Sequence, residues 1–394
     1  MTELDYKAPG SIGRLQQRAL VAGIIGVVLC IVGFFRSPDQ FFQSYLVAFL
    51  FVLGLSLGSL GLVMLQHMTG GDWGIVIRRP LESAAHNLWL VVILFVPIIL
   101  GMKHIYVAWL NAPLSGESAL SDFQKRYLTS SAFITRAIIY FGVWLALMLI
   151  LDRWSKQQDI NREDRRIRRD LKMLSGPGIL LYVFGMGFAS IDWVMSISPH
   201  WFSTIYGFIF VAGQTISALS LVICIVILVA QTAPMAGLIQ QRHLHDLGKL
   251  LLAFVMLWAY FCFSQLLIIW SGNQPEEISF YYSRLNGGWG VVAVIILIFH
   301  FFVPFLLLLS RDVKRNPKLL PLVCLGLIFM RLVDLFWTTR PEFTSNAVPS
   351  WLDIAAPLAL GGLWLAFFAR NIQSQPLLPL GDPKLEEAIA HDEH

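Results

Sequence analysis

Long apolar stretches, each separated from the next by a short polar segment, dominate this chain of 394 residues. An α-helix needs about 20 apolar residues to cross a bilayer, and ten stretches are close to that length or longer. The pattern predicts membrane-spanning helices rather than the amphipathic helices of a soluble protein. The ten predicted spans are 17–35, 45–66, 84–102, 131–151, 177–196, 204–230, 249–270, 288–309, 319–338 and 351–369.

The composition leads to the same fold class. Hydrophobic residues make up 56% of the chain and charged residues only 14%, which leaves too little polar surface to cover a soluble globule of this size. We therefore predict an all-α polytopic membrane protein that forms one integral membrane domain over residues 1–394. The net charge of +4 comes from basic residues concentrated in loops, where membrane topology explains them, so it does not indicate nucleic-acid binding.

The basic residues predict how the chain is oriented. Most of the 29 Lys and Arg residues fall in the two termini and in every second loop. Cytoplasmic loops of membrane proteins carry the excess of Lys and Arg, so both termini are expected in the cytoplasm, including a cytoplasmic tail at 371–394. The expected location is a bacterial cytoplasmic (inner) membrane, and we expect lipids among the partners and no nucleic acid.

Cysteine and histidine are poorly placed for redox centres. The cysteines stand alone in apolar spans, without the spacing of an iron–sulfur cluster or a covalently attached haem. His86 and His104 lie at opposite ends of one span, about 27 Å apart at 1.5 Å per residue, which does not suit a bound b-type haem. We expect no metal site and no cofactor held by this chain, quinone or quinol excepted. The isolated cysteines are Cys30, Cys224, Cys262 and Cys324.

The segment 188–207, with the sequence FASIDWVMSISPHWFSTIYG, carries the clearest polar feature. It places Asp192 near the outer end of an apolar helix, where a carboxylate costs roughly 2.5–3.5 kcal/mol on insertion scales. Such a group normally has a partner, a water-filled pocket or a proton to carry. Trp193, Trp201 and Tyr206 around it are expected to form an interfacial aromatic belt.

Further polar residues are predicted in the outer half of the membrane, where they form a candidate quinone pocket or proton path with Asp192. Arg331 and Asp334 are three residues apart on one helix face, a spacing that permits an ion pair, and this pair could serve structure alone or carry protons. His104 would approach Asp192 if their helices share a bundle. The candidate outer-half residues are Asp192, Asp334, Arg331, Gln265 and His104.

The inner half of the membrane has its own candidates for a proton path. His300 lies near the middle of the span 288–309, while His86, His67 and Glu82 gather near the cytoplasmic ends of two other spans. A lone histidine in a membrane helix is more commonly a core residue that is hydrogen-bonded to a neighbouring helix, and this alternative for His300 stays open. No catalytic residue is assigned.

The number of spans and the segment 188–207 resemble a known family. Ten spans with both termini in the cytoplasm, together with FASIDWVMSISPHWFSTIYG at 188–207, are similar to the second quinone-binding membrane subunit (ActF) of alternative complex III, a quinol:cytochrome c oxidoreductase. That family is similar in turn to the NrfD-like membrane subunits of polysulfide reductase-type enzymes. The resemblance implies two four-helix bundles, at 45–196 and 204–338, with the first and last spans at the periphery.

The resemblance also implies a function within a respiratory complex that oxidises quinol near the outer face. Its partners would be a related NrfD-like membrane subunit, an iron–sulfur subunit and c-type cytochromes, which would carry the iron–sulfur clusters and the haem. This chain would supply a proton path, a quinone pocket or structural support without a redox centre, so whether it is itself an enzyme stays open. In the related catalytic subunit a histidine and an acid bind quinol, and here only Asp192 matches in type and place.

A stand-alone secondary transporter or proton-conducting membrane protein is the alternative from a different class. Transporters built from inverted repeats usually show short, broken hydrophobic segments at matching positions of their two halves. The sequence shows no such matching pair. Copurification with haem-bearing and iron–sulfur partners would separate the two functions.

Overall fold

Helices account for the regular secondary structure in the part of the chain that the computed structural model describes, residues 6–112, 120–161, 165–231, 235–236, 238–382 and 385. Ten helical segments among these residues are long and apolar enough to cross a membrane. This confirms the predicted fold class of an all-α, multi-pass membrane protein. Of the predicted tail at 371–394, residues 383–384 and 386–394 lie outside the described residues.

Each candidate span coincides with a predicted one, and most extend beyond it because their polar ends do not add to the hydropathy signal. The third span is interrupted at Asn87, and the eighth contains a π-helical turn, η3. In chain order the spans are α1 (Gly10–Arg36), α2 (Pro38–Thr69), α4 and α5 (Arg78–His86 and Leu88–Leu100), α9 (Ser130–Ile160), α10 (Arg165–Trp193) with η2 (Met195–Ile197), α11 (Tyr206–Ala230), α12 (Gln241–Gly272), α14, η3 and α15 (Trp289–Ile296, Leu297–Phe302 and Val303–Leu309), α17 (Leu319–Thr339) with η4 (Arg340–Glu342), and α18 (Leu352–Gln373).

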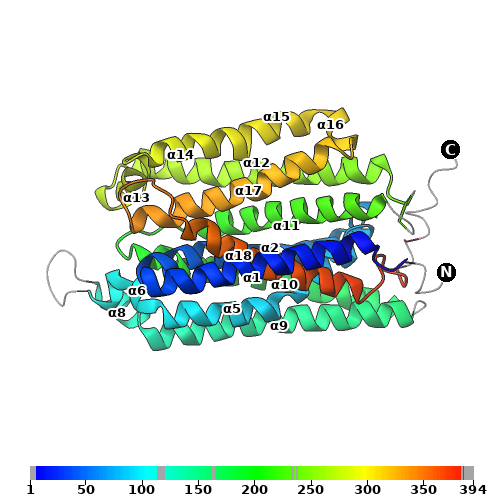
Figure 1. Cartoon of the computed structure of the whole chain (residues 1–394), viewed down its shortest axis with the longest axis horizontal. Helices are drawn as coiled ribbons and strands as arrows, with labels where there is room; N and C mark the ends of the chain where they lie inside the picture. Colours follow the sequence, from blue (N-terminus) through cyan, green and yellow to red (C-terminus); the bar gives the residue numbers. More distant parts are fainter. Residues whose placement is uncertain are drawn as a thin grey trace.

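The long helices run side by side along the long axis of the molecule (Figure 1). The two described ends of the chain meet at one end, which we call the terminal end, where the Leu377 N–H donates to the Tyr6 carbonyl oxygen (2.9 Å). Short helices cap both ends. The opposite end carries α6 (Met102–Ile105), α7 (Val107–Leu110), α8 (Asp122–Tyr127) and α13 (Pro275–Leu285), and the terminal end carries α3 (Asp72–Ile75) and α16 (Arg311–Arg315).

The packing of the spans has two centres, α2 and α11. In the first bundle α2 packs against α4, α5 and α10, and α9 packs against α10 and α5. In the second bundle α11 packs against α12 and α17, α15 packs against α12, and α14 and η3 pack against α17. The most apolar 18-residue stretch is 94% buried in α2 but only 22% buried in α12, so α2 lies inside the protein while most of α12 lies on its outer surface.

Glycines permit the close contact between the two bundles. A Cβ atom on Gly58 of α2 would lie 2.3 Å from the carbonyl oxygen of Gln214 in α11, where no side chain fits. Within the first bundle, a Cβ atom on Gly61 would lie 2.7 Å from the ring of Tyr182 in α10. Small residues at helix interfaces bring backbones together inside a membrane, so Gly58 lets α2 approach α11 of the second bundle, and Gly61 lets it approach α10 of its own bundle.

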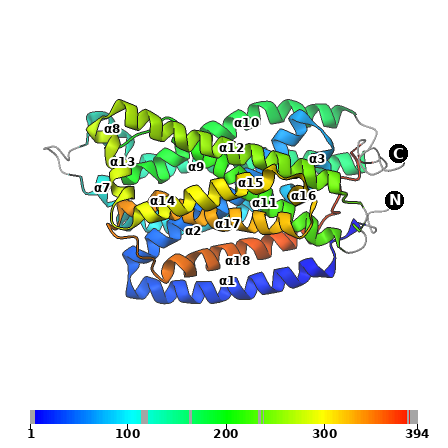
Figure 2. The same cartoon turned by 90° about the horizontal axis from the view of Figure 1, so that it is seen from above.

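The first and last spans, α1 and α18, form a pair outside the two bundles (Figure 2). Their backbones almost touch, because a Cβ atom on Gly26 would lie 2.3 Å from the backbone nitrogen of Ala359. Trp364 of α18 donates its Nε1–H to the Ser56 hydroxyl of α2 (2.8 Å). The pair is therefore attached to the first bundle through α18.

Candidate functional site

Asp192 lies in the last turn of α10 inside the first bundle, and its carboxylate is completely buried. Arg136 of α9 donates two hydrogen bonds to it, from Nε to Oδ2 and from Nη2 to Oδ1, both at 2.8 Å. Tyr140, one helical turn further along α9, donates its hydroxyl to Oδ2 (2.7 Å). A bidentate guanidinium and a third donor satisfy both carboxylate oxygens, so this is a closed ion pair.

Arg136 is a partner that the sequence analysis missed. It precedes Asp192 by 56 positions, so no local spacing connects them, although a lone guanidinium inside an apolar span indicates a buried acid somewhere. Its Nη1 also donates to the carbonyl oxygen of Tyr127 (3.0 Å), and the guanidinium lies 3.8 Å from the centre of the Tyr127 ring. Burial, with the negative charge of Asp192 nearby, raises the pKa of Tyr127 to about 12, so this phenol keeps its proton at neutral pH.

The aromatic residues near this ion pair are buried, which corrects the expected interfacial belt. Trp193 is fully buried, with its ring centre 4.9 Å from that of Phe95 and 5.5 Å from that of Phe141. Trp201 and Tyr206 are buried as well. The prediction was wrong because all three side chains pack against other parts of this protein and leave almost no surface for lipid headgroups.

His104, on α6, packs against the first turns of α2 and does not contact Asp192. Its Nδ1 contacts the carboxylate of Asp39, and its ring stacks on Phe42 with 5.0 Å between centres. Gly101 leaves room for this arrangement, since a Cβ atom there would lie 2.1 Å from the Phe42 ring. The described contacts therefore do not include His104 in the Asp192 site.

Arg331 and Asp334 form a buried ion pair on α17, as their spacing predicted. The guanidinium lies against Gly213 of α11, where an added Cβ atom would come within 2.4 Å of it. It is also 5.5 Å from the ring centre of Phe210. The pair connects α17 to α11 inside the second bundle, and any role in proton movement stays a prediction.

His300 lies on the π-helical turn η3 and is fully buried. Its ring meets Trp258 of α12 edge to face, with 4.4 Å between ring centres. Neither ring nitrogen has a hydrogen-bond partner among the described residues. No described hydrogen bond or ion pair joins His300 to the other candidates for the inner half.

Glu82 is the centre of a polar network near the terminal end. It accepts hydrogen bonds from Arg78 Nε (3.0 Å), Arg79 Nη1 (2.7 Å) and the Ser155 hydroxyl (2.7 Å), and its side chain is buried. Two guanidinium groups therefore hold this carboxylate in place. The arrangement ties α4 to α9 and favours a structural role for Glu82.

The network extends to the C-terminal segment of the chain at Asp382. Arg78 Nη1 donates to Asp382 (3.1 Å), and Arg79 pairs with Asp159. His67 lines a small polar cavity of about 30 Å³ beside Arg78, and His86 lines another of about 50 Å³ beside Glu82. Each of these two histidines thus lines a hollow that borders the same ion-pair network.

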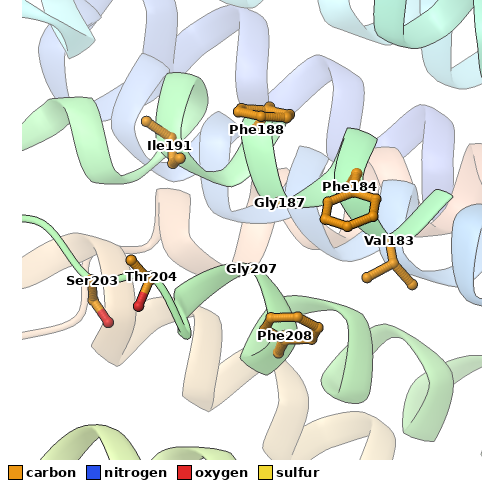
Figure 3. A pocket seen from close by; sticks show the side chains of 9 residues that line it. All are labelled: Val183, Phe184, Gly187, Phe188, Ile191, Ser203, Thr204, Gly207 and Phe208. Atoms are coloured by element: carbon orange, nitrogen blue, oxygen red, sulfur yellow. The ribbon is translucent and has the colours of Figure 1, made fainter. Parts of the chain in front are cut away.

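A cleft opens between α10 and α11 in the half of the molecule away from the termini. Its apolar half has a volume of about 210 Å³, and Figure 3 shows its aromatic and aliphatic side chains with two hydroxyl-bearing residues at one end. The helices cross closely here, because a Cβ atom on Gly207 would lie 2.5 Å from the Cα of Gly187. The apolar half is lined by Val183, Phe184, Gly187, Phe188, Ile191, Ser203, Thr204, Gly207 and Phe208.

A second hollow of about 100 Å³ adjoins the first, since Ser203 and Thr204 line both. We call it the polar half of the cleft. The Ser203 hydroxyl donates to Gln265 Oε1 (3.0 Å), and Gln265 Nε2 donates to the hydroxyl of Tyr281 (3.4 Å). Burial raises the pKa of Tyr281 to about 12. The polar half is lined by Phe202, Ser203, Thr204, Ile205, Gln265, Ile268, Ile269 and Glu277.

Of the predicted candidates, only Gln265 lines this cleft. Ser203 and Thr204 belong to the segment 188–207 that the sequence analysis selected. Their role in the cleft was not predicted, because the selection rested on the insertion cost of the charged Asp192. Glu277 follows the apolar span 249–270 and carried no signal of its own in the sequence. Together these residues offer a hydroxyl pair, an amide and a carboxylate at the end of an apolar groove.

Among the described residues, no group of three or more His, Cys, Asp or Glu side chains is arranged to hold a metal ion. No protein-family model matches the chain, and no curated protein matches its sequence.

Proposed function

We propose that this chain is a membrane subunit of a respiratory quinol:cytochrome c oxidoreductase of the alternative complex III type, and that the cleft between α10 and α11 is its quinone pocket. The observation that carries the proposal is the pair of adjoining hollows that share Ser203 and Thr204. Both hollows have mainly apolar walls, and the smaller one adds Gln265 and Glu277 to the two shared hydroxyl groups. Ligand pockets combine mostly apolar walls with a few polar groups that orient the ligand.

The polar groups suit a quinone head. Hydroxyl and amide groups both donate and accept hydrogen bonds, so Ser203, Thr204 and Gln265 suit the carbonyls of the oxidised form and the hydroxyls of the reduced form. The exposed aromatic side chains of Phe184, Phe188 and Phe208 border the apolar half on the membrane side. An isoprenoid tail would leave the cleft past them into lipid.

In this proposal Asp192 serves structure instead of binding quinol. Both of its oxygens are already held by Arg136 and Tyr140, so a quinol hydroxyl would have to displace a bidentate ion pair. The resemblance in the sequence favoured Asp192 as the quinol-binding acid. Because Asp192 is already held by these hydrogen bonds, the contacts favour the cleft over Asp192 as the quinone-binding site.

The proposed complex would lie in a bacterial cytoplasmic membrane with both termini of this chain in the cytoplasm. The cleft would then open near the outer face. Electrons from quinol would pass to the iron–sulfur clusters and haem of partner subunits, which would include a related NrfD-like membrane subunit.

The proposal is tested by purifying the tagged chain from its native membranes and assaying quinol-dependent reduction of cytochrome c. Haem-bearing and iron–sulfur subunits should copurify with it. Thr204→Trp, which fills the junction of the two halves, should lower turnover at least about tenfold in an assembled complex. Val291→Trp is the matched control, because Val291 is 64% exposed on α14 and lines no part of the cleft.

Two results would count against the proposal. Full turnover of an assembled Thr204→Trp complex would remove the cleft from the reaction. Isolation of the chain as a lone oligomer that moves a solute across vesicle membranes would favour the transporter alternative.

A further inference from the structure

Glu277 differs from the other acids at the opposite end of the molecule. Its side chain lines the polar half of the cleft, is only partly buried, and has no hydrogen-bond or ion-pair partner among the described residues. The other acids there that approach the protein interior are each paired with a cation. These pairs are Asp192 with Arg136, Asp334 with Arg331, Glu342 with Arg284, and Asp353 with Arg340.

The local backbone explains why Glu277 faces the cleft. The chain turns sharply after α12, with Asn273 in the left-handed region (φ 48°), and Pro275 begins α13. The Glu277 carboxylate then lies over the end of α12, where a Cβ atom on Gly272 would be 3.7 Å from its Oε2. Tyr281, one turn later on α13, contacts Gln265, so the same face of α13 covers the polar half.

We infer that Glu277 is the proton acceptor of the cleft. The inference rests on the proposed function, because it requires quinol to bind there. The O–H bond of a quinol hydroxyl breaks, its proton moves to a carboxylate oxygen of Glu277, and one electron leaves for an iron–sulfur cluster of a partner subunit. Glu277 then releases the proton to water at the opposite end. A second round removes the second proton and the second electron and leaves quinone.

The neighbouring groups do not compete for this role. The pKa of Tyr281 is raised to about 12 by burial, so its hydroxyl holds its proton at neutral pH and serves as a hydrogen-bond partner. Ser203, Thr204 and Gln265 are not bases. Glu277 is the one carboxylate among the described residues that line either half of the cleft, and its partial exposure gives it contact with water.

Glu277→Gln tests the inference, because it keeps the shape of the side chain and removes the base. Loss of a general base typically lowers turnover about 100- to 10,000-fold, so we expect a fall of at least about 100-fold with quinone affinity within about threefold of the unmodified complex. Glu276→Gln is the matched control, since Glu276 is the preceding residue and is exposed outside the cleft. Glu277→Ala should regain part of its turnover when formate is added, which a structural defect would not.

The outcomes separate this inference from the proposed function. If Thr204→Trp abolishes turnover while Glu277→Gln keeps it, quinol reacts in the cleft and Glu277 is not the acceptor. If neither variant affects turnover, the cleft is not the quinone pocket. Loss of turnover in Glu277→Gln together with loss of quinone binding, without formate rescue of Glu277→Ala, would also overturn the assignment.

Discussion

Asp192 and Glu277 are carboxylates near the same end of the molecule, but their surroundings differ. Asp192 is completely buried in the first bundle, and its two oxygens accept three hydrogen bonds from α9. Glu277 lines a cleft beside the second bundle, with no described partner. An acid that already holds a guanidinium contributes to packing, whereas an acid that faces an accessible cleft is available for proton transfer.

The comparison also shows why burial alone is a poor guide to function. A buried charge in a membrane protein suggests a functional site, and this reasoning selected Asp192 from the sequence. The insertion cost of Asp192 is offset by Arg136, which neutralises it within the same bundle. The partly exposed Glu277 has no such cost, so the same reasoning did not select it from the sequence.

Among these variants, Arg136→Leu should have the largest effect, and that effect should be on the stability of the folded complex. Removing one partner of a buried pair typically costs about 3–5 kcal/mol because the other charge stays buried. We expect the amount of folded complex to fall sharply, measured as the fraction that survives solubilisation and heating. Glu277→Leu should leave that fraction unchanged.

The double variant Arg136→Leu with Asp192→Leu sharpens the test. It removes both charges together, so it should recover most of the folded complex and retain turnover per assembled complex. Turnover that stays absent in a well-assembled double variant would show that the Asp192 pair takes part in the reaction itself.

Gln265→Leu should have a smaller effect, confined to the cleft. A single hydrogen bond contributes about 0.5–1.5 kcal/mol, so quinone binding should weaken about 2- to 10-fold in a titration of the purified complex. Ser264→Ala is the control on the same helix, because Ser264 does not line the cleft. Unchanged affinity in Gln265→Leu would place the quinone head elsewhere.

Most of the fold followed from hydropathy, because each span is a long apolar run and the structure has a helix at each one. The Arg331 and Asp334 pair was readable because three residues on one helix share a face. These features depend on residues that are near each other in the chain.

The remaining features depend on contacts between distant segments. The Arg136 and Asp192 pair joins two helices, and hydropathy does not specify which spans are neighbours. The cleft arises where α10 and α11 cross at Gly187 and Gly207, and Glu277 reaches it only through the turn at Asn273. The aromatic belt failed for the same reason, because which side of α10 faces protein is decided by helix packing.

Mapping the attachment site of a photoreactive quinone tests the central claim most directly. The purified complex would be irradiated with diazirine-bearing benzoquinone and naphthoquinone analogues, and the labelled peptides of this chain identified by mass spectrometry. We expect label within 183–191, 203–208 and 265–277, and we expect Thr204→Trp to abolish it while Val291→Trp does not. Label confined to the surroundings of Asp192, at 127–144, would contradict the account.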